Sequence, residues 1–180
     1  MRRFVNPGDT AFEVAVNSQI YVDKTGLLAY TNSVINTKQA LICSSRPRRF
    51  GKSITADMLC AYYSRGCDSD SIFASYEIAK SDSYKKYLNQ YDVIYLDIQW
   101  CMMDAGSAEQ TVSYLNYHVI EELKEIYPQI LPDGIRTAYG AMSRINAQTG
   151  VKFIVIIDEW DVLIRDEAAN EAVLQDYINF

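Results

Sequence analysis

The tripeptide Gly51-Lys52-Ser53 has the residue types that bind nucleotide phosphates. A glycine lets the backbone turn left-handed and approach a phosphate, a lysine reaches the β and γ oxygens, and a serine hydroxyl coordinates Mg²⁺. The tripeptide therefore predicts a P-loop for ATP with Mg²⁺, in which Lys52 acts on the phosphates and Ser53 on the metal. The predicted cofactor-binding stretch consists of Arg46, Pro47, Arg48, Arg49, Phe50, Gly51, Lys52, Ser53 and Ile54.

The loop departs at one position from the pattern GxxxxGK[ST], because Arg46 stands where the first glycine is expected. At average residue usage, the bare tripeptide occurs by chance in about one chain in ten of this size. Arg46, Arg48 and Arg49 can add charge-assisted phosphate contacts, or they can form an ordinary solvated basic loop. The loop is weak evidence until a second motif supports it.

The second motif is the acidic pair Asp158-Glu159, which directly follows the apolar run at 153–157. Ligands of an open α/β sheet bind beyond the carboxyl ends of its strands, where the loop after residue 45 also lies. We expect Asp158 to hold the Mg²⁺, and Glu159 to orient or deprotonate the attacking water. The alternative is that both acids polarise the end of a buried strand or cap the next helix.

Three short runs are apolar at both alternating positions, as in parallel strands that are buried on both faces. They cover residues 40–43, 93–96 and 153–157. Between and after them lie segments with helical period, so the order is strand, helix, strand, helices, strand, helix. This alternation predicts βαβ crossovers and an α/β fold, namely a P-loop NTPase-like three-layer α/β/α arrangement with a mostly parallel sheet.

The helical segments carry specific start, stop and burial signals. The first starts at Lys52 and ends near Gly66, with its inward face at Ile54, Met58 and Ala61/Tyr62. A capping box of Ser107 and Gln110 starts the second, which ends before Pro128. The third follows Asp133 and stops at Gly150, and its expected inward residues are Ile135, Tyr139, Met142 and Ile145.

Residues 1–180 are predicted to form a single P-loop domain with an N-terminal extension at 1–39 and an insertion at 64–91. A short helix in the extension is expected to be capped by Asp23. Asp23 and Lys24 can line the nucleotide pocket, or they can be an N-cap and a surface lysine. Phe50 and Trp160 are expected to pack against other side chains rather than stack on a base.

Composition limits the partners of the chain. With 49% hydrophobic residues and a net charge of −6, it has the content of a globular domain and lacks the spare Lys and Arg of a general nucleic-acid surface. Its four cysteines have no CxxC spacing, which argues against zinc and favours a reducing compartment. Without a signal peptide or a run of about 20 apolar residues, a cytoplasmic location and no membrane partner are expected.

Four segments together resemble the bacterial AAA-ATPase-like family, whose members often carry a C-terminal PD-(D/E)XK nuclease-like domain. They are residues 21–25 (YVDKT), 46–53 (RPRRFGKS), 93–96 (VIYL) and 158–161 (DEWD). Arginine commonly opens the loop in that family. The resemblance implies that Lys52 and Ser53 take the Walker A roles, Asp158 the Walker B role and Glu159 the role of the catalytic glutamate.

The same resemblance implies that further parts follow the single helix expected at 162–180. They are a fourth strand, sensor residues, an arginine finger and the nuclease-like domain, so nucleic acid is expected as a partner only indirectly. Open strand edges favour a homo-oligomer or a swapped dimer. The leading hypothesis is an ATP/Mg²⁺-binding domain whose hydrolysis requires a longer parent protein; the alternatives are a non-catalytic nucleotide-sensing module and, less favoured, a small-molecule kinase.

Overall fold

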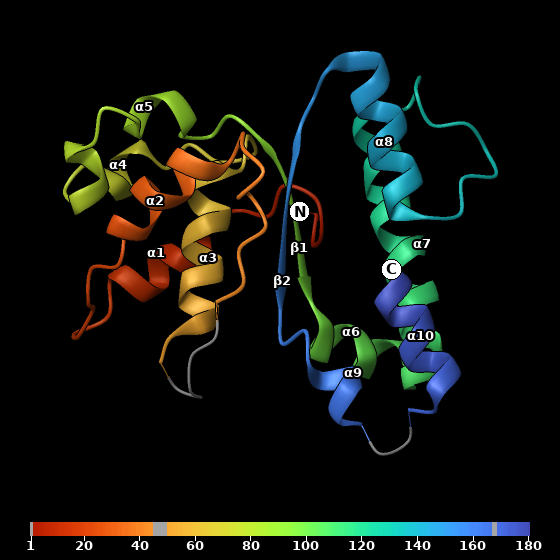
Figure 1. The fold of residues 1–180 in the computed structure, drawn as a ribbon. Helices are drawn as coiled ribbons and strands as arrows, with labels where there is room; N and C mark the ends of the chain where they lie inside the picture. Colours follow the sequence, from red (N-terminus) through yellow and green to blue (C-terminus); the bar gives the residue numbers. More distant parts are fainter. Residues whose placement is uncertain (1, 45–49, 167–168) are drawn as a thin grey trace. The chain divides into compact units, whose positions relative to one another are not determined.

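The computed structural model describes residues 2–44, 50–166 and 169–180, and it shows an α/β protein with a small two-stranded parallel sheet. Its residues group into two compact units (Figure 1). Unit 1 contains residues 6–93, and unit 2 contains residues 2–5 and 94–180. The organisation as a single domain stays a prediction.

Unit 1 is helical, and its longest helix follows the predicted phosphate loop. Helix α3 packs against α1, and the 3-10 helix η1 contacts both α2 and α5. After α3, a parallel bridge between Ser64 and Tyr91 leads into β1 (Asp92–Asp97). The helices of unit 1 are α1 (Thr10–Val16), α2 (Gly26–Val34), α3 (Lys52–Tyr63), α4 (Asp70–Phe73), η1 (Glu77–Lys80) and α5 (Tyr84–Tyr87).

Aromatic side chains fill the interior of unit 1. The rings of Phe12 and Phe73 stack with centroids 5.2 Å apart, and Tyr62 meets Phe73 edge-on at 5.3 Å. Tyr62 and Tyr63 are fully buried near the end of α3, so their hydroxyl groups need partners inside the protein. Burial raises the pKa of Tyr62 to about 12.

Asn32 of α2 supplies these partners. Its Nδ2 donates to the hydroxyl of Tyr62 at 3.0 Å, and its Oδ1 accepts from the hydroxyl of Tyr63 at 2.8 Å. The Tyr62 hydroxyl in turn donates to the carbonyl oxygen of Tyr84 at 2.8 Å. A buried amide that bonds both tyrosines links α2 to α3 and so supports the helix that carries the loop residues.

We expect Asn32→Leu to lower the free energy of unfolding by about 2–3 kcal/mol, because two buried tyrosine hydroxyls each lose a partner. Urea unfolding followed by circular dichroism measures this change. Asn17→Leu is the control, because Asn17 is exposed in the same unit and should change stability by less than about 0.5 kcal/mol. Equal effects of the two substitutions would contradict the role assigned to Asn32.

The predicted strand at residues 40–43 is wrong. Residues 40–44 have no regular structure and are exposed, and Leu41 reaches 96% exposure. A buried parallel strand is stable only when neighbouring strands satisfy its backbone and helices cover its faces. No strand pairs with this segment in the described part of unit 1, so the apolar run has no surface to pack on.

Helix α3 begins at Lys52 and ends at Tyr63, which confirms the helix predicted from the glycine-lysine step to near Gly66. Its buried face includes Met58, Ala61 and Tyr62, as predicted. Ile54, however, is exposed, which is a correction. Burial along α3 starts only at Ala56, because the first turn extends beyond the aromatic interior.

In unit 2, β1 runs parallel to β2 (Phe153–Asp158), and the chain between them forms three helices. This confirms the strands predicted at 93–96 and 153–157. The N-terminal segment pairs with β1, because Val5 bridges Ile94 and the Tyr95 N–H donates to the Phe4 carbonyl at 2.8 Å. The helices of unit 2 are α6 (Ile98–Ala105), α7 (Ala108–Ile126), α8 (Ala138–Thr149), α9 (Val162–Arg165) and α10 (Glu171–Asn179).

The two strands differ in burial. Strand β1 is largely buried, as predicted, whereas Val155 and Ile157 of β2 are each 45% exposed. The expectation that β2 is buried on both faces is therefore wrong. In the described part of the chain β2 has β1 as its one neighbouring strand, and an edge strand cannot be enclosed as an interior strand is.

Three details of the helices of unit 2 also need correction. Ser107 precedes α7, but its side chain forms no cap bond; its carbonyl accepts from the Gln110 N–H and the Thr111 hydroxyl instead. Helix α8 ends at Gly150, as predicted. Tyr139, however, is 73% exposed, because the buried face of α8 is formed by Ala138, Ala141 and Ile145. The single helix expected at 162–180 is two helices, α9 and α10.

No helix within the described ranges has both the length and the hydrophobicity that crossing a bilayer requires.

Candidate functional site

The phosphate-loop residues belong to unit 1. Arg46, Pro47, Arg48 and Arg49 lie outside the described residues, and the structure describes the loop from Phe50 onward. Gly51 adopts the left-handed conformation, with φ +72° and ψ +38°, directly before α3. This confirms the left-handed turn that the glycine was expected to allow, and Lys52 and Ser53 then form the first turn of the helix.

The first turn of an α-helix has amide N–H groups without intrahelical partners, and the helix dipole adds positive potential there. In α3 this turn is accessible, because Lys52 is half-buried and Ser53 and Ile54 are exposed. Such a turn behind a left-handed glycine can bind a phosphate through its backbone, with the lysine ammonium as a further donor. The described residues therefore have the local geometry of a phosphate site.

Phe50 and Trp160 are both at least half exposed, so the expectation that they pack against other side chains is wrong. Phe50 directly precedes the left-handed glycine and is 60% exposed. Trp160 lies in unit 2, where its carbonyl oxygen accepts a bond from the Tyr177 hydroxyl at 2.8 Å.

Asp23 does not cap a helix directly, which corrects the expected N-cap. Helix α2 forms as predicted but starts at Gly26 with Thr25 as its N-cap residue. The Asp23 carboxylate accepts the N–H of Thr25 at 2.8 Å and that of Glu77 at 2.9 Å. Burial acts to raise the pKa of Asp23, but these amide hydrogen bonds outweigh it and hold the pKa below its usual value.

Replacing Gly51 by alanine should destabilise the fold and disturb the loop. The left-handed φ alone costs a non-glycine residue about 1–2 kcal/mol, and a Cβ at Gly51 would lie 2.8 Å from the Lys24 ammonium nitrogen. Gly106→Ala is the matched control, because Gly106 also has a positive φ but open space at its Cβ position.

We expect both substitutions to lower the free energy of unfolding in urea by about the same 1–2 kcal/mol. Only Gly51→Ala should also weaken nucleotide binding. Unchanged nucleotide binding by Gly51→Ala would contradict the place of the turn in the site.

The acidic residues belong to unit 2. Asp158 is the last residue of β2 and is only 7% exposed. Its Oδ1 accepts the Glu159 N–H at 3.0 Å, while its Oδ2 is buried without a hydrogen-bond partner in the described chain. A buried carboxylate oxygen without a partner is unfavourable, and a cation would satisfy it. This oxygen fits Mg²⁺, which prefers hard oxygen ligands.

Among the described residues, no three His, Cys, Asp or Glu side chains form a group that could hold a metal alone. Mg²⁺ in nucleotide sites takes one or two protein oxygens and fills its remaining positions with water and phosphate.

Glu159 has a positive φ of +50°, which is uncommon for a residue other than glycine. Its Oε2 lies 3.7 Å from a guanidinium nitrogen of Arg165, whose Nε contacts Asp161 at 2.9 Å. Backbone strain of this kind costs on the order of 1 kcal/mol and persists where surrounding contacts hold it, often at functional sites. The ion pair to α9 gives the Glu159 carboxylate a defined direction.

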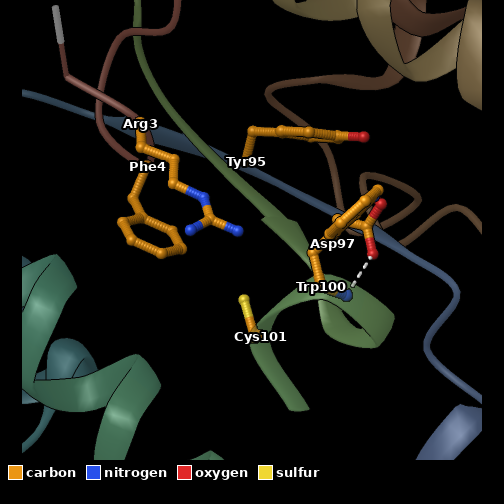
Figure 2. A pocket seen from close by; sticks show the side chains of 6 residues that line it. All are labelled: Arg3, Phe4, Tyr95, Asp97, Trp100 and Cys101. Carbon is orange, nitrogen blue, oxygen red and sulfur yellow. Dashed lines mark hydrogen bonds between the residues drawn. The ribbon is translucent and has the colours of Figure 1, made fainter. Parts of the chain in front are cut away.

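Asp97 is a third acidic residue at this edge, and the sequence reasoning missed it. It ends β1, and its carboxylate accepts the Trp100 N–H at 3.0 Å at the start of α6 (Figure 2). Burial raises the pKa of Asp97 above its usual value, and the charges of Asp158 and Glu159 raise it further. The available signal was an acid directly after the apolar run at 93–96, the same pattern that identified Asp158.

A small pocket of about 190 Å³ in unit 2 opens beside Asp97 (Figure 2). Its volume is below the roughly 300–1,000 Å³ of typical small-molecule sites. Asp158 and Glu159 do not line it, so it does not mark the site that the acidic pair predicts. The lining residues are Arg3, Phe4, Tyr95, Asp97, Trp100 and Cys101.

The predicted site residues thus fall in two units, with residues 50–54 in unit 1 and Asp158 and Glu159 in unit 2. Each group has a local structure suited to its expected role. Their joint action on one nucleotide stays a prediction.

Comparison with curated proteins and with solved structures finds no significant match. The family described as "Predicted AAA-ATPase" matches residues 10–180, which include both the predicted phosphate loop and the acidic pair. The chain therefore belongs to this AAA-ATPase-like family.

Proposed function

We propose that this chain binds ATP with Mg²⁺ and that ATP hydrolysis is the reaction of the complete site. The observation that carries the proposal is the left-handed Gly51 directly before Lys52 at the start of α3, in a chain of an AAA-ATPase-like family. A left-handed glycine followed by lysine at a helix N-terminus is the arrangement that brings backbone amides and an ammonium group to one phosphate.

The proposal assigns a role to each residue. Backbone N–H groups of the first turn of α3 and the Lys52 ammonium bind the β and γ phosphates. The Ser53 hydroxyl and the Asp158 carboxylate would hold Mg²⁺, which supplies positive charge to the phosphate oxygens. Contacts from Arg46, Arg48 and Arg49 to the phosphates remain part of the proposal.

In hydrolysis, the Glu159 carboxylate accepts a proton from a water molecule while the water oxygen bonds to the γ-phosphorus. The bond from the γ-phosphorus to the bridging oxygen breaks, which leaves ADP and inorganic phosphate. Arg165 supports this role because it orients the Glu159 carboxylate from 3.7 Å.

Thermal unfolding with increasing ATP, in the presence and absence of Mg²⁺, tests the binding part of the proposal. Nucleotide at 100 times its Kd should stabilise the chain by about 2.7 kcal/mol. An unchanged unfolding midpoint up to millimolar MgATP would contradict nucleotide binding by this chain.

Glu159→Gln separates hydrolysis from binding. The amide cannot accept the water proton, so we expect turnover to fall by about 10²–10⁴-fold while the ATP affinity changes little. Measurements of phosphate release and of ATP binding test this, with the exposed Glu171→Gln as control. Wild-type protein that binds ATP without any turnover would identify a nucleotide-sensing module instead of an ATPase.

A further inference from the structure

The segment before α2 is attached to η1 by the two residues that flank Lys24. Asp23 accepts the N–H groups of Thr25 and Glu77, at 2.8 and 2.9 Å. The Thr25 side chain is fully buried, and its Oγ1 accepts the N–H of Ile78 at 3.1 Å. Three hydrogen bonds therefore hold this short stretch in one place, and the position of the Lys24 backbone is defined.

The Lys24 side chain extends from this anchored backbone to the phosphate loop. Its ammonium donates a hydrogen bond to the Phe50 carbonyl oxygen at 2.9 Å. The same nitrogen would lie only 2.8 Å from a Cβ on Gly51, so the absence of a side chain at Gly51 leaves room for it. The Lys24 charge thus lies against the left-handed turn that precedes Lys52.

The charge of Lys24 is available to an anion at this turn. An ammonium group has three N–H donors, and one of them serves the Phe50 carbonyl. In the described part of the chain, no carboxylate forms an ion pair with Lys24. A lysine ammonium that touches the backbone of a phosphate loop and has no acidic partner suits a phosphate oxygen as its second acceptor.

We propose that Lys24 is a second phosphate-binding lysine of the nucleotide site, in addition to Lys52. Lys24 reaches the phosphates from the α2 side of the loop, whereas Lys52 reaches them from α3. This inference rests on the proposed function, because it concerns the same nucleotide. It also gives Gly51 a second role, since any larger residue there displaces the Lys24 ammonium.

A purely structural role makes a different prediction from a phosphate contact. If Lys24 only held the loop through the Phe50 carbonyl, a neutral donor would preserve much of its effect. Lys24→Gln keeps an N–H donor and removes the charge, Lys24→Met removes both, and Lys24→Arg keeps both. Lys38→Met is the control for loss of one positive charge, because Lys38 is exposed in the same unit.

Equilibrium binding of MgATP, MgADP and AMP to these variants and to Lys52→Ala tests the proposal. We expect Lys24→Met and Lys24→Gln to weaken MgATP binding by about 10–100-fold, the loss of a charged hydrogen bond. Lys24→Arg should stay within about fivefold of wild type and Lys38→Met within about twofold. AMP, which lacks the β and γ phosphates, should bind the Lys24 variants almost as it binds wild type.

Two results would overturn the role of Lys24 alone, provided that wild type binds MgATP and Lys52→Ala does not. The first is a MgATP affinity of Lys24→Met equal to that of Lys38→Met. The second is a MgATP affinity of Lys24→Gln that returns to the wild-type value. Absence of MgATP binding by wild type would overturn the proposed function and this inference together. Unfolding midpoints without nucleotide identify any variant that misfolds. The comparison of Lys24→Gln with Lys24→Arg then decides whether MgATP binding needs the positive charge at this position.

Discussion

Replacing Lys52 by alanine is expected to abolish the stabilisation that MgATP gives to the folded chain. At 100 times the wild-type Kd, the wild type gains about 2.7 kcal/mol, and a variant that no longer binds gains nothing. The reason is that Lys52 opens the first turn of α3 behind the left-handed Gly51 and supplies the ammonium group for the β and γ phosphates. Thermal unfolding with and without MgATP measures the difference.

Lys38→Ala serves as the control for this experiment, because it removes a positive charge from an exposed position of the same unit. It should keep the full ligand-dependent shift. Stabilisation of Lys52→Ala by MgATP as strong as that of wild type would contradict the role of Lys52 in phosphate binding.

Replacing Asp158 by asparagine is expected to change binding and stability in opposite directions. The Oδ2 of Asp158 is buried without a partner in the described chain, and the negative charge of Asp158 is one of those that raise the pKa of Asp97. Removing the buried charge relieves this repulsion, so without Mg²⁺ the free energy of unfolding should rise by about 1 kcal/mol. Urea unfolding in the presence of a chelator measures this gain.

The same substitution removes a metal ligand. Mg²⁺ should strengthen ATP binding by wild type, and Asp158→Asn should lose this effect by at least about tenfold. Asp176→Asn, at an exposed position of α10, is the control for loss of one carboxylate and should behave as wild type in both measurements. Lower stability of Asp158→Asn together with an unchanged Mg²⁺ effect would show that the carboxylate is structural.

Features that depend on nearby residues could be predicted from the sequence. The glycine-lysine step at Gly51 predicts both the left-handed turn and the start of α3, because these properties belong to the local backbone. The apolar runs predict β1 and β2, and Gly150 predicts the end of α8. In each case the signal lies within a few residues of the structure that it specifies.

Features that depend on distant contacts could not be predicted in the same way. Residues 40–43 have the composition of a buried strand, but a strand needs neighbours, which composition does not provide. Tyr139 has the correct spacing for an inward residue, yet the face of α8 that packs is set by the neighbouring helices. The spacing of apolar residues therefore predicts that a helix forms, but it does not determine which face of the helix is buried.

The candidate site shows the same contrast between features set by nearby residues and features set by distant contacts. Lys52 and Asp158 are recognised from local motifs, whereas the position of Lys24 depends on a bond to Phe50, which is 26 residues away. Without the contact to Phe50, the two interpretations of Lys24, as a residue of the nucleotide pocket or as a surface lysine, cannot be distinguished. Asp97 carried a local signal, an acid after an apolar run, but its charge interaction with Asp158 and Glu159 arises only when β1 and β2 pair.

Equilibrium dialysis of the chain against radiolabelled ATP, with and without Mg²⁺, tests the central claim most directly because it counts bound nucleotide. We expect saturable binding of one ATP per chain, strengthened by Mg²⁺ and absent in Lys52→Ala. The absence of saturable binding by wild type, or equal binding by Lys52→Ala, would contradict it.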